Sequence, residues 1–223
     1  MMLQDTAFSQ GEGDAWFERN RGFYDPDQDP VLTFLSSQRI EPRAIVEIGA
    51  SRGDRLARLH QRYRAGVTAV EPSAAAVTEG RHSFPGIRFF VATARSLPLA
   101  DESFDLVILN FVFHWIDRKS LLASAAEIDR VLQPEGHLFI GDFAPFGPTK
   151  NKYHHRPDLE MYTYKQDYPA LFLATAGYRL LAQQIFDFRT LKPGTEIPER
   201  ERCSMALLQK VPGGIYGHES AAS

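Results

Sequence analysis

Short apolar runs alternate with amphipathic segments between residues 44 and 143. The runs at 44–49, 67–71, 87–91, 104–111 and 136–143 have the length and composition of buried strands. Between them, the segments 52–63, 73–83 and 117–132 repeat apolar residues at helical spacing; Leu56, Leu59 and Tyr63, for example, share one face of the first. Strands that alternate with helices in this way predict a parallel sheet covered on both faces.

The segments on either side follow other patterns. Residues 1–14 are predicted to be a mobile leader, followed by short helices over 14–25 and 31–38. The segment 144–172 is long, punctuated by proline and rich in Tyr and His, and a loop of this length is more often functional than idle. Two long strands are predicted at 178–188 and 202–211, forming an antiparallel hairpin that closes the sheet.

These patterns predict one α/β domain of 223 residues. We expect a Rossmann-like, doubly wound fold with a seven-stranded, mostly parallel sheet, a C-terminal antiparallel β-hairpin and an N-terminal helical lid. In such a sheet the ligand loops lie at the carboxyl ends of the strands. The predicted parts are a leader and helical lid (1–40), a ligand-binding core (41–145), a lid insertion over the substrate (146–177), the terminal hairpin (178–212) and a disordered tail (213–223).

Composition narrows the class of protein without identifying it. The hydrophobic content of 43% is ordinary for a globular protein, and the net charge of -3 gives no electrostatic reason to expect a nucleic acid or an anionic membrane as partner. The single cysteine, Cys203, suits a reducing compartment. The polar start is unlike a signal peptide, and no apolar run nears the ~18 residues of a membrane span. We expect a cytoplasmic monomer or homodimer.

The loop after the first predicted strand reads VEIGASRGDRL, from Val46 to Leu56. A P-loop needs a lysine after its second glycine, and here Asp54 and Arg55 follow Gly53. A dinucleotide fingerprint needs G-x-G-x-x-G, whereas Ser51 stands at its second glycine position. Glu47 would also lie unfavourably close to a pyrophosphate. Both phosphate-binding interpretations are therefore weak.

A third interpretation fits better. The sequence E-x-G-x-S-x-G at 47–53 resembles motif I, [D/E]-x-G-x-G-x-G, of class I S-adenosylmethionine-dependent methyltransferases. ARSLPLADESFDLVILNFVFHWI (94–116) and AAEIDRVLQPEGHLFIGDF (125–143) resemble two successive segments of the methyltransferase type 11 family. The resemblance covers roughly residues 44–143. It implies S-adenosyl-L-methionine as the methyl donor and S-adenosyl-L-homocysteine as the product.

The resemblance also implies which residues hold the cofactor. Glu47 would lie close to the amino group, and Glu71, at the end of the second strand, would accept both ribose hydroxyls. An acid at that place is also expected in nicotinamide enzymes. Serine in place of the middle glycine predicts a negative φ at Ser51. The complete predicted set is Glu47, Gly49, Ala50, Ser51, Gly53, Glu71, Pro72, Thr93, Ala94, Leu109, Asn110 and Arg19.

One position departs from the family pattern. The family usually has an acid before Ala94, where a carboxylate accepts the adenine amino group, and this sequence has Thr93. A hydroxyl can accept the same hydrogen bond without the charge-assisted contribution. We therefore expect adenine to be held more weakly or differently, with binding retained. Arg19 would either pair with the cofactor carboxylate or point into solvent.

Methyl transfer from a sulfonium is an in-line displacement, so the protein aligns the reactants, excludes water and removes a proton from a hydroxyl acceptor. His114, after the fourth strand, and His154 and His155, in the insertion, are the candidate bases. Adjacent histidines in an extended chain face opposite ways, so we expect one to face the acceptor; with no third ligand at a usual spacing, no metal is expected. Asp142 could orient a base or the substrate.

The expected function is methyl transfer to an oxygen, or alternatively a nitrogen, of a small-molecule acceptor in a biosynthetic, natural-product or carbohydrate pathway. Two alternatives remain open: a catalytically silent, partner-binding subunit with this fold, and a nicotinamide-dependent oxidoreductase. The predicted substrate lid consists of Trp16, Phe17, Tyr153, Tyr162, Tyr164, Tyr168 and Asp142.

Overall fold

The computed structural model describes residues 4–22 and 24–216. Its central sheet has seven strands in the order β3-β2-β1-β4-β5-β9-β8. The first five in this order are parallel, and β9 runs antiparallel to both β5 and β8. This confirms the predicted fold class. The strands are β1 (Ala44–Ile48), β2 (Gly66–Glu71), β3 (Arg88–Val91), β4 (Phe104–Asn110), β5 (Leu132–Phe143), β8 (Tyr178–Asp187) and β9 (Arg202–Lys210).

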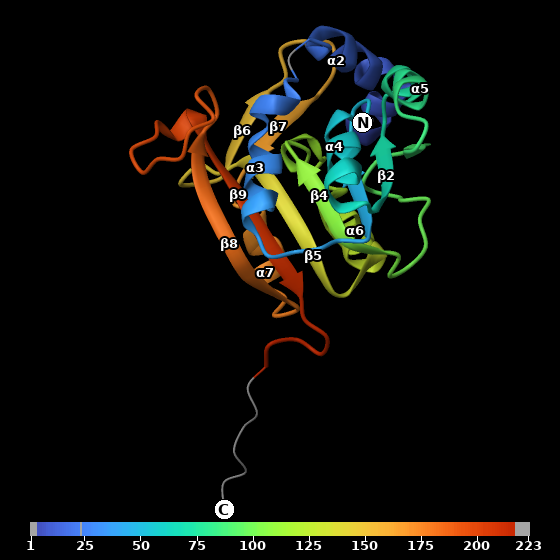
Figure 1. Cartoon of the computed structure of the whole chain (residues 1–223). Helices are drawn as coiled ribbons and strands as arrows, with labels where there is room; N and C mark the ends of the chain where they lie inside the picture. The colour runs from blue at the N-terminus through green and yellow to red at the C-terminus, as the bar shows by residue number, and fades with distance from the viewer. Residues whose placement is uncertain (1–3, 23, 217–223) are drawn as a thin grey trace, which may run out of the picture.

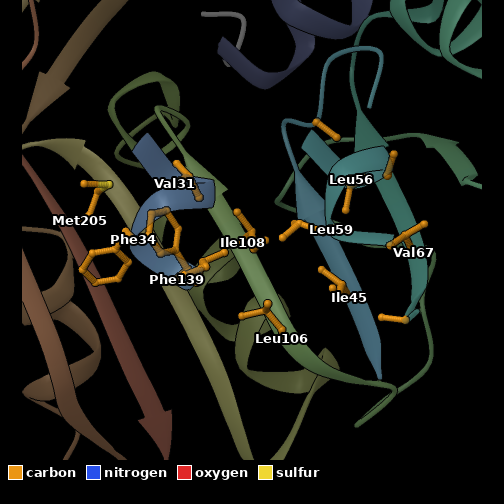
Figure 2. Packing of buried hydrophobic residues seen from close by; sticks show 14 of the residues in the cluster. Val31, Phe34, Ile45, Leu56, Leu59, Val67, Leu106, Ile108, Phe139 and Met205 are labelled. Carbon is orange, nitrogen blue, oxygen red and sulfur yellow. The ribbon is translucent and has the colours of Figure 1, made fainter. Parts of the chain in front are cut away.

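Helices cover both faces of the sheet (Figure 1). One face packs against α3 (Pro30–Ser37), α4 (Asp54–Tyr63) and α5 (Ala74–Ser83), and the other against α6 (Leu121–Val131) and α7 (Pro169–Leu173). Because side chains alternate along a strand, Ile45 faces the first layer and Val46 the second. Figure 2 shows Leu56 and Leu59 of α4 against Ile45. Each fully buried leucine stabilises the fold by about 1.5–3 kcal/mol.

The N-terminal segment is helical where a mobile leader was predicted. It forms α1 (Gln4–Ala7), the π-helical turn η1 (Phe8–Glu12) and α2 (Gly13–Asn20). Tertiary hydrogen bonds hold it: the Gln4 side chain donates to the Trp115 carbonyl at 2.8 Å and accepts from the Tyr162 N–H at 2.6 Å. Such contacts leave no periodic signal in the sequence, so the prediction was wrong for residues 4–14. Residues 1–3 lie outside the described residues.

The segment 144–172 also contains regular structure that was not predicted. The strands β6 (Thr149–Lys152) and β7 (Tyr162–Lys165) form a separate antiparallel hairpin, and α7 follows. Figure 1 shows this hairpin and α2 at the end of the molecule toward which the arrowheads of β2 and β4 point. They therefore lie where a lid over a ligand site was expected.

The remaining elements are short. They are the 3-10 turns η2 (Pro26–Gln28), η3 (Phe113–Trp115) and η4 (Glu199–Glu201). α2 ends at Asn20, earlier than the predicted helix over 14–25, of which residue 23 is not described. Of the predicted disordered tail, residues 217–223 lie outside the described part. No helix among the described residues is long and apolar enough to cross a membrane.

Candidate functional site

A cavity of about 1060 Å³ lies at the carboxyl ends of β1, β2 and β4, between α2 and the β6–β7 hairpin. Most of the residues predicted from the sequence come together in its wall. Those that line it are Trp16, Arg19, Glu47, Gly49, Ala50, Ser51, Glu71, Pro72, Thr93, Ala94, Asn110, His114, Tyr153, His154 and His155.

The loop after β1 approaches the cavity with left-handed backbone. Gly49 has φ +76° and donates its N–H to the Val70 carbonyl at 2.8 Å; a Cβ at this position would overlap the side chain of Val112. Ser51 has φ +50°, so the predicted negative φ is wrong. The conformation costs a non-glycine residue about 1–2 kcal/mol. It turns the Ser51 N–H toward the Glu71 carboxylate, which accepts it at 2.9 Å and offsets that cost.

Glu71 ends β2 as a buried carboxylate with both oxygens oriented by the backbone. One oxygen accepts the Ser51 N–H and the other the Ser73 N–H, each at 2.9 Å. Burial raises the pKa of Glu71 to about 7, although the two N–H donors act in the opposite direction. Carboxylate oxygens have lone pairs beyond these two bonds, so the group can also accept two adjacent hydroxyls of a ligand.

Glu47 lies at the base of the cavity with one oxygen unsatisfied. Its other oxygen pairs with Arg55, whose Nε donates to Asp29 at 2.7 Å. Oε2 of Glu47 is buried and has no hydrogen-bond partner in the described part of the chain. Burial raises the pKa of Glu47, and the Arg55 charge opposes the shift. A buried acceptor without a partner is costly, and a ligand ammonium group would satisfy it.

Thr93, Ala94 and Pro72 line the cavity beside these carboxylates. Asp5 from α1 lines it as well, and its Oδ2 is buried without a partner among the residues described. Burial raises the pKa of Asp5. Asp5 was not among the predicted site residues, because the N-terminal segment has no pattern that predicts its docking.

His114 and Asp142 form a buried pair at the opposite side of the cavity. His114 Nδ1 lies 2.9 Å from Asp142 Oδ1, and the His114 backbone N–H donates to Oδ2 at 3.2 Å. Asp142 also accepts the Phe143 N–H at 2.7 Å and lies behind His114, away from the cavity. Because a carboxylate accepts hydrogen bonds, Nδ1 carries the proton in this pair, and Nε2 is the basic nitrogen. The hypothesis that Asp142 orients a base matches this geometry.

An aromatic wall, which was not predicted, and a lysine adjoin His114. The rings of Phe111, Phe143 and Phe188 lie 5.2–5.3 Å apart, centroid to centroid. Nζ of Lys165 lies 3.5 Å from the centroid of the Phe143 ring. All four residues line the cavity. They come from the residue after β4, from β5 and β7, and from the segment after β8, so only the folded sheet brings them together.

His154 and His155 occupy a turn after β6 and lie on the same side of the chain. Their ring centroids are 3.9 Å apart, and both exposed side chains line the cavity. The prediction that they face opposite ways is wrong, because it assumed extended backbone. The neighbouring Tyr153 is buried, and its hydroxyl contacts both Glu12 at 2.7 Å and Arg19 at 2.6 Å. Arg19 is thus paired with Glu12 and is not simply solvated.

Seven of the predicted residues do not line the cavity. Leu109 lies in the core, and Gly53, with φ +88°, packs against Phe89 before α4. Tyr168 stacks on Phe113 with ring centroids 5.0 Å apart. Strand alternation turns Tyr162 and Tyr164 away and places Thr163 and Lys165 on the cavity side instead. The full set outside the wall is Phe17, Gly53, Leu109, Asp142, Tyr162, Tyr164 and Tyr168.

The sheet order, the acidic glycine loop after β1 and the acid that ends β2 identify the fold as that of class I S-adenosylmethionine-dependent methyltransferases. Residues 46–140 match the family model of the methyltransferase domain. Among the described residues there is no cluster of three or more His, Cys, Asp or Glu side chains that could hold a metal ion.

Curated relatives carry the same domain. A malonyl-[acyl-carrier protein] O-methyltransferase of Halorhodospira halophila is 35% identical over 124 residues, which are 54% of this chain and 40% of that protein. An uncharacterised methyltransferase of Mycobacterium tuberculosis is 30% identical over 135 residues, 60% of this chain and 52% of that protein. The matched region thus spans about half the length of these relatives or less.

A solved structure extends the likeness to nearly the whole chain. The 1,6-didemethyltoxoflavin-N1-methyltransferase of Burkholderia thailandensis, with bound 1,6-didemethyltoxoflavin and S-adenosylhomocysteine, superposes with a TM-score of 0.70. The match covers 92% of this chain and 88% of that one, at 16% identity. At this identity the likeness supports the fold alone.

The residues of this chain fit the cofactor of the class. The unsatisfied Glu47 Oε2 suits an ammonium group, and the oriented Glu71 carboxylate suits two ribose hydroxyls. A phosphate group does not fit, because Glu47 and Glu71 would repel it.

Proposed function

We propose that this chain transfers a methyl group from S-adenosylmethionine to an oxygen atom of a small-molecule acceptor. One observation carries the proposal: the His114–Asp142 pair belongs to the same cavity as the loop that contains Glu47 and Gly49. A nucleoside-binding end and an end with an oriented base are the two parts that methylation of a hydroxyl requires.

At the nucleoside-binding end of the cavity, the chain binds and orients the cofactor. Glu47 holds an ammonium group, and Glu71 holds adjacent hydroxyls. The bound cofactor supplies an electrophilic methyl group. The mostly buried wall around Gly49 and Ala50 excludes water, so alignment of the reactants rather than a covalent enzyme intermediate carries the reaction.

At the second end, His114 acts on the acceptor. Asp142 keeps the proton on Nδ1, which leaves Nε2 to take the proton of an acceptor hydroxyl. As the imidazole becomes positively charged, Asp142 stabilises it, as the carboxylate does in other Asp–His pairs. An amine acceptor needs this base less, so the buried pair favours oxygen over nitrogen as the methylated atom.

The relatives supply a second argument for oxygen. The curated relatives include proteins named malonyl-[acyl-carrier protein] O-methyltransferase from three organisms, at 31–35% identity. An acceptor attached to a carrier protein is therefore the main variant of the proposal. Free acceptors and their carrier-bound thioesters, assayed side by side, distinguish the two.

The test has two stages. Calorimetry with S-adenosylhomocysteine measures cofactor binding, and release of S-adenosylhomocysteine from a panel of hydroxyl and amine acceptors measures transfer. We expect micromolar cofactor binding and transfer to hydroxyls that falls at least tenfold in His114→Asn with unchanged cofactor affinity. If the protein does not bind the cofactor at millimolar concentration, the hypothesis that it is an enzyme is refuted, and the hypothesis of a partner-binding subunit remains. A fluorescence titration in which NADH binds instead would favour the nicotinamide oxidoreductase.

A further inference from the structure

Lys165 is a half-buried cation in the cavity wall that no part of the proposed chemistry uses. It ends β7, and its Nζ lies over the Phe143 ring, 3.5 Å from the centroid. No carboxylate among the described residues forms an ion pair with it. The nearest acids are committed elsewhere, since Asp142 binds His114 and Glu201 pairs with Arg200.

The position of Lys165 is a consequence of the β6–β7 hairpin. Side chains alternate along β7, so Thr163 and Lys165 face the cavity while Tyr162 and Tyr164 face away. A solvated lysine would extend its ammonium group into water, whereas this one lies against an aromatic face. Burial lowers the pKa of Lys165, so the charged form is partly desolvated and would gain from an anionic partner.

The surroundings of Lys165 define the shape of that partner. Phe111, Phe143 and Phe188 form an aromatic wall, and the His114 ring packs against Phe143 at 5.1 Å between centroids. Phe111 has φ +56°, which is unusual for a bulky residue and is the kind of strain that occurs at ligand sites. His114 and Lys165 contact the same Phe143 ring, so one small molecule can reach both.

We propose that the cavity selects an aromatic or conjugated acid, whose carboxylate pairs with Lys165 while its flat body lies against Phe111, Phe143 and Phe188. The inference rests on the proposed function, since this acid is the methyl acceptor, and it adds the substrate class. Lys165 is then a residue that determines specificity. An ammonium group and a carboxylate attract more strongly in this partly enclosed site than in water.

Lys150 provides a matched control. It lies on the neighbouring strand β6, and its Nζ is 3.7 Å from the centroid of the Tyr162 ring, so it makes the same type of contact. It does not line the cavity. Lys165→Met removes a cation–π contact with Phe143, and Lys150→Met removes contacts of the same type with Tyr162 and Tyr164 on the same hairpin, but only the first variant removes charge from the cavity.

The experiment measures binding of paired probes by calorimetry in the presence of saturating S-adenosylhomocysteine. The pairs are benzoate and benzamide, cinnamate and cinnamamide, and 4-hydroxybenzoate and 4-hydroxybenzamide. We expect the wild type and Lys150→Met to bind at least one acid tenfold or more tightly than its amide. Lys165→Met should reduce that preference to within twofold, and Lys165→Arg should keep part of it.

Two results would overturn the inference. In the first, the wild type binds no acid more tightly than its amide, or binds none of the probes at all. In the second, Lys165→Met keeps the preference for the acid. S-adenosylhomocysteine affinity, measured without probes, separates this failure from failure of the proposed function. A protein that binds the cofactor without preferring acids has the function but a different substrate class. A protein that does not bind the cofactor lacks the function itself.

Discussion

Acidification is expected to release the cofactor through Glu71. The pKa of this buried carboxyl is raised to about 7, so it is mostly ionised above neutral pH and mostly protonated below. The ionised form accepts hydrogen bonds from two hydroxyls with the charge-assisted contribution, and the neutral form loses that contribution. The affinity for the cofactor is therefore highest above about pH 7 and falls as the pH drops through this value.

The size of the expected loss of cofactor affinity follows from the raised pKa of Glu71. About two pH units below the pKa, roughly 1% of Glu71 is ionised, which limits the loss of affinity to on the order of 100-fold. The protonated acid still makes neutral hydrogen bonds, weaker by about 1–1.5 kcal/mol each. Two such bonds give about 2–3 kcal/mol, so the dissociation constant is expected to rise roughly 30–100-fold between about pH 8 and about pH 5.

Calorimetric titration with S-adenosylhomocysteine across this range measures the effect, with Glu71→Gln as the control. Glu71→Gln should bind weakly at pH 8 and lack most of the slope, because its amide does not titrate; what remains belongs to the other cavity groups with a shifted pKa, Glu47, Asp5 and His155. For Glu71 itself, acidification favours the fold, since its folded pKa exceeds its unfolded one. A wild-type affinity that varies less than threefold, or an equal slope in the variant, would refute the reasoning.

Three further predictions concern the loop, the adenine end and the base. Gly49→Ala places a Cβ against Val112 in a left-handed conformation, so thermal or urea unfolding should show a loss of about 2–4 kcal/mol; a loss below 1 kcal/mol would contradict the steric argument. Thr93→Asp restores a charged acceptor and should tighten S-adenosylhomocysteine binding about fivefold, roughly 1 kcal/mol, by calorimetry; weaker binding would place adenine elsewhere. Asp142→Asn should lower turnover of hydroxyl acceptors at least tenfold, because the amide holds His114 less well, while cofactor affinity stays within twofold; unchanged turnover would remove His114 from the chemistry.

The sequence was sufficient to predict the core because its signals are local. Each strand from β1 to β5 is an apolar run next to a helical pattern, and Glu47, Gly49 and Glu71 lie at or near the ends of such runs. In a parallel sheet the carboxyl ends of the strands meet, so residues 20 positions apart in the chain were correctly expected at one place.

The lid was not predictable in the same way. The segments around Gln4 and Tyr153 are ordered by contacts with residues more than 100 positions away, such as Gln4 with Trp115 and Tyr153 with Glu12. No local periodicity records such pairs. The β6–β7 hairpin has four-residue strands, too short for an alternating pattern to predict which residues face the ligand. Tyr162 and Tyr164 were therefore expected in the cavity, but Thr163 and Lys165 are the β7 residues that line it.

The two ends of the cavity carry opposite electrostatic requirements, and this constrains the acceptor. Glu47 and Glu71 place acidic groups at one end, where an ammonium group and hydroxyls satisfy them. Lys165 places a cation at the other end, beside a histidine that gains a positive charge when it removes a proton. A cationic acceptor would leave the charge of Lys165 unpaired and would oppose the build-up of positive charge on His114. An anionic acceptor would neutralise Lys165 and would stabilise the positive charge that the proposed proton removal places on His114, so selection for an acid would also assist that step.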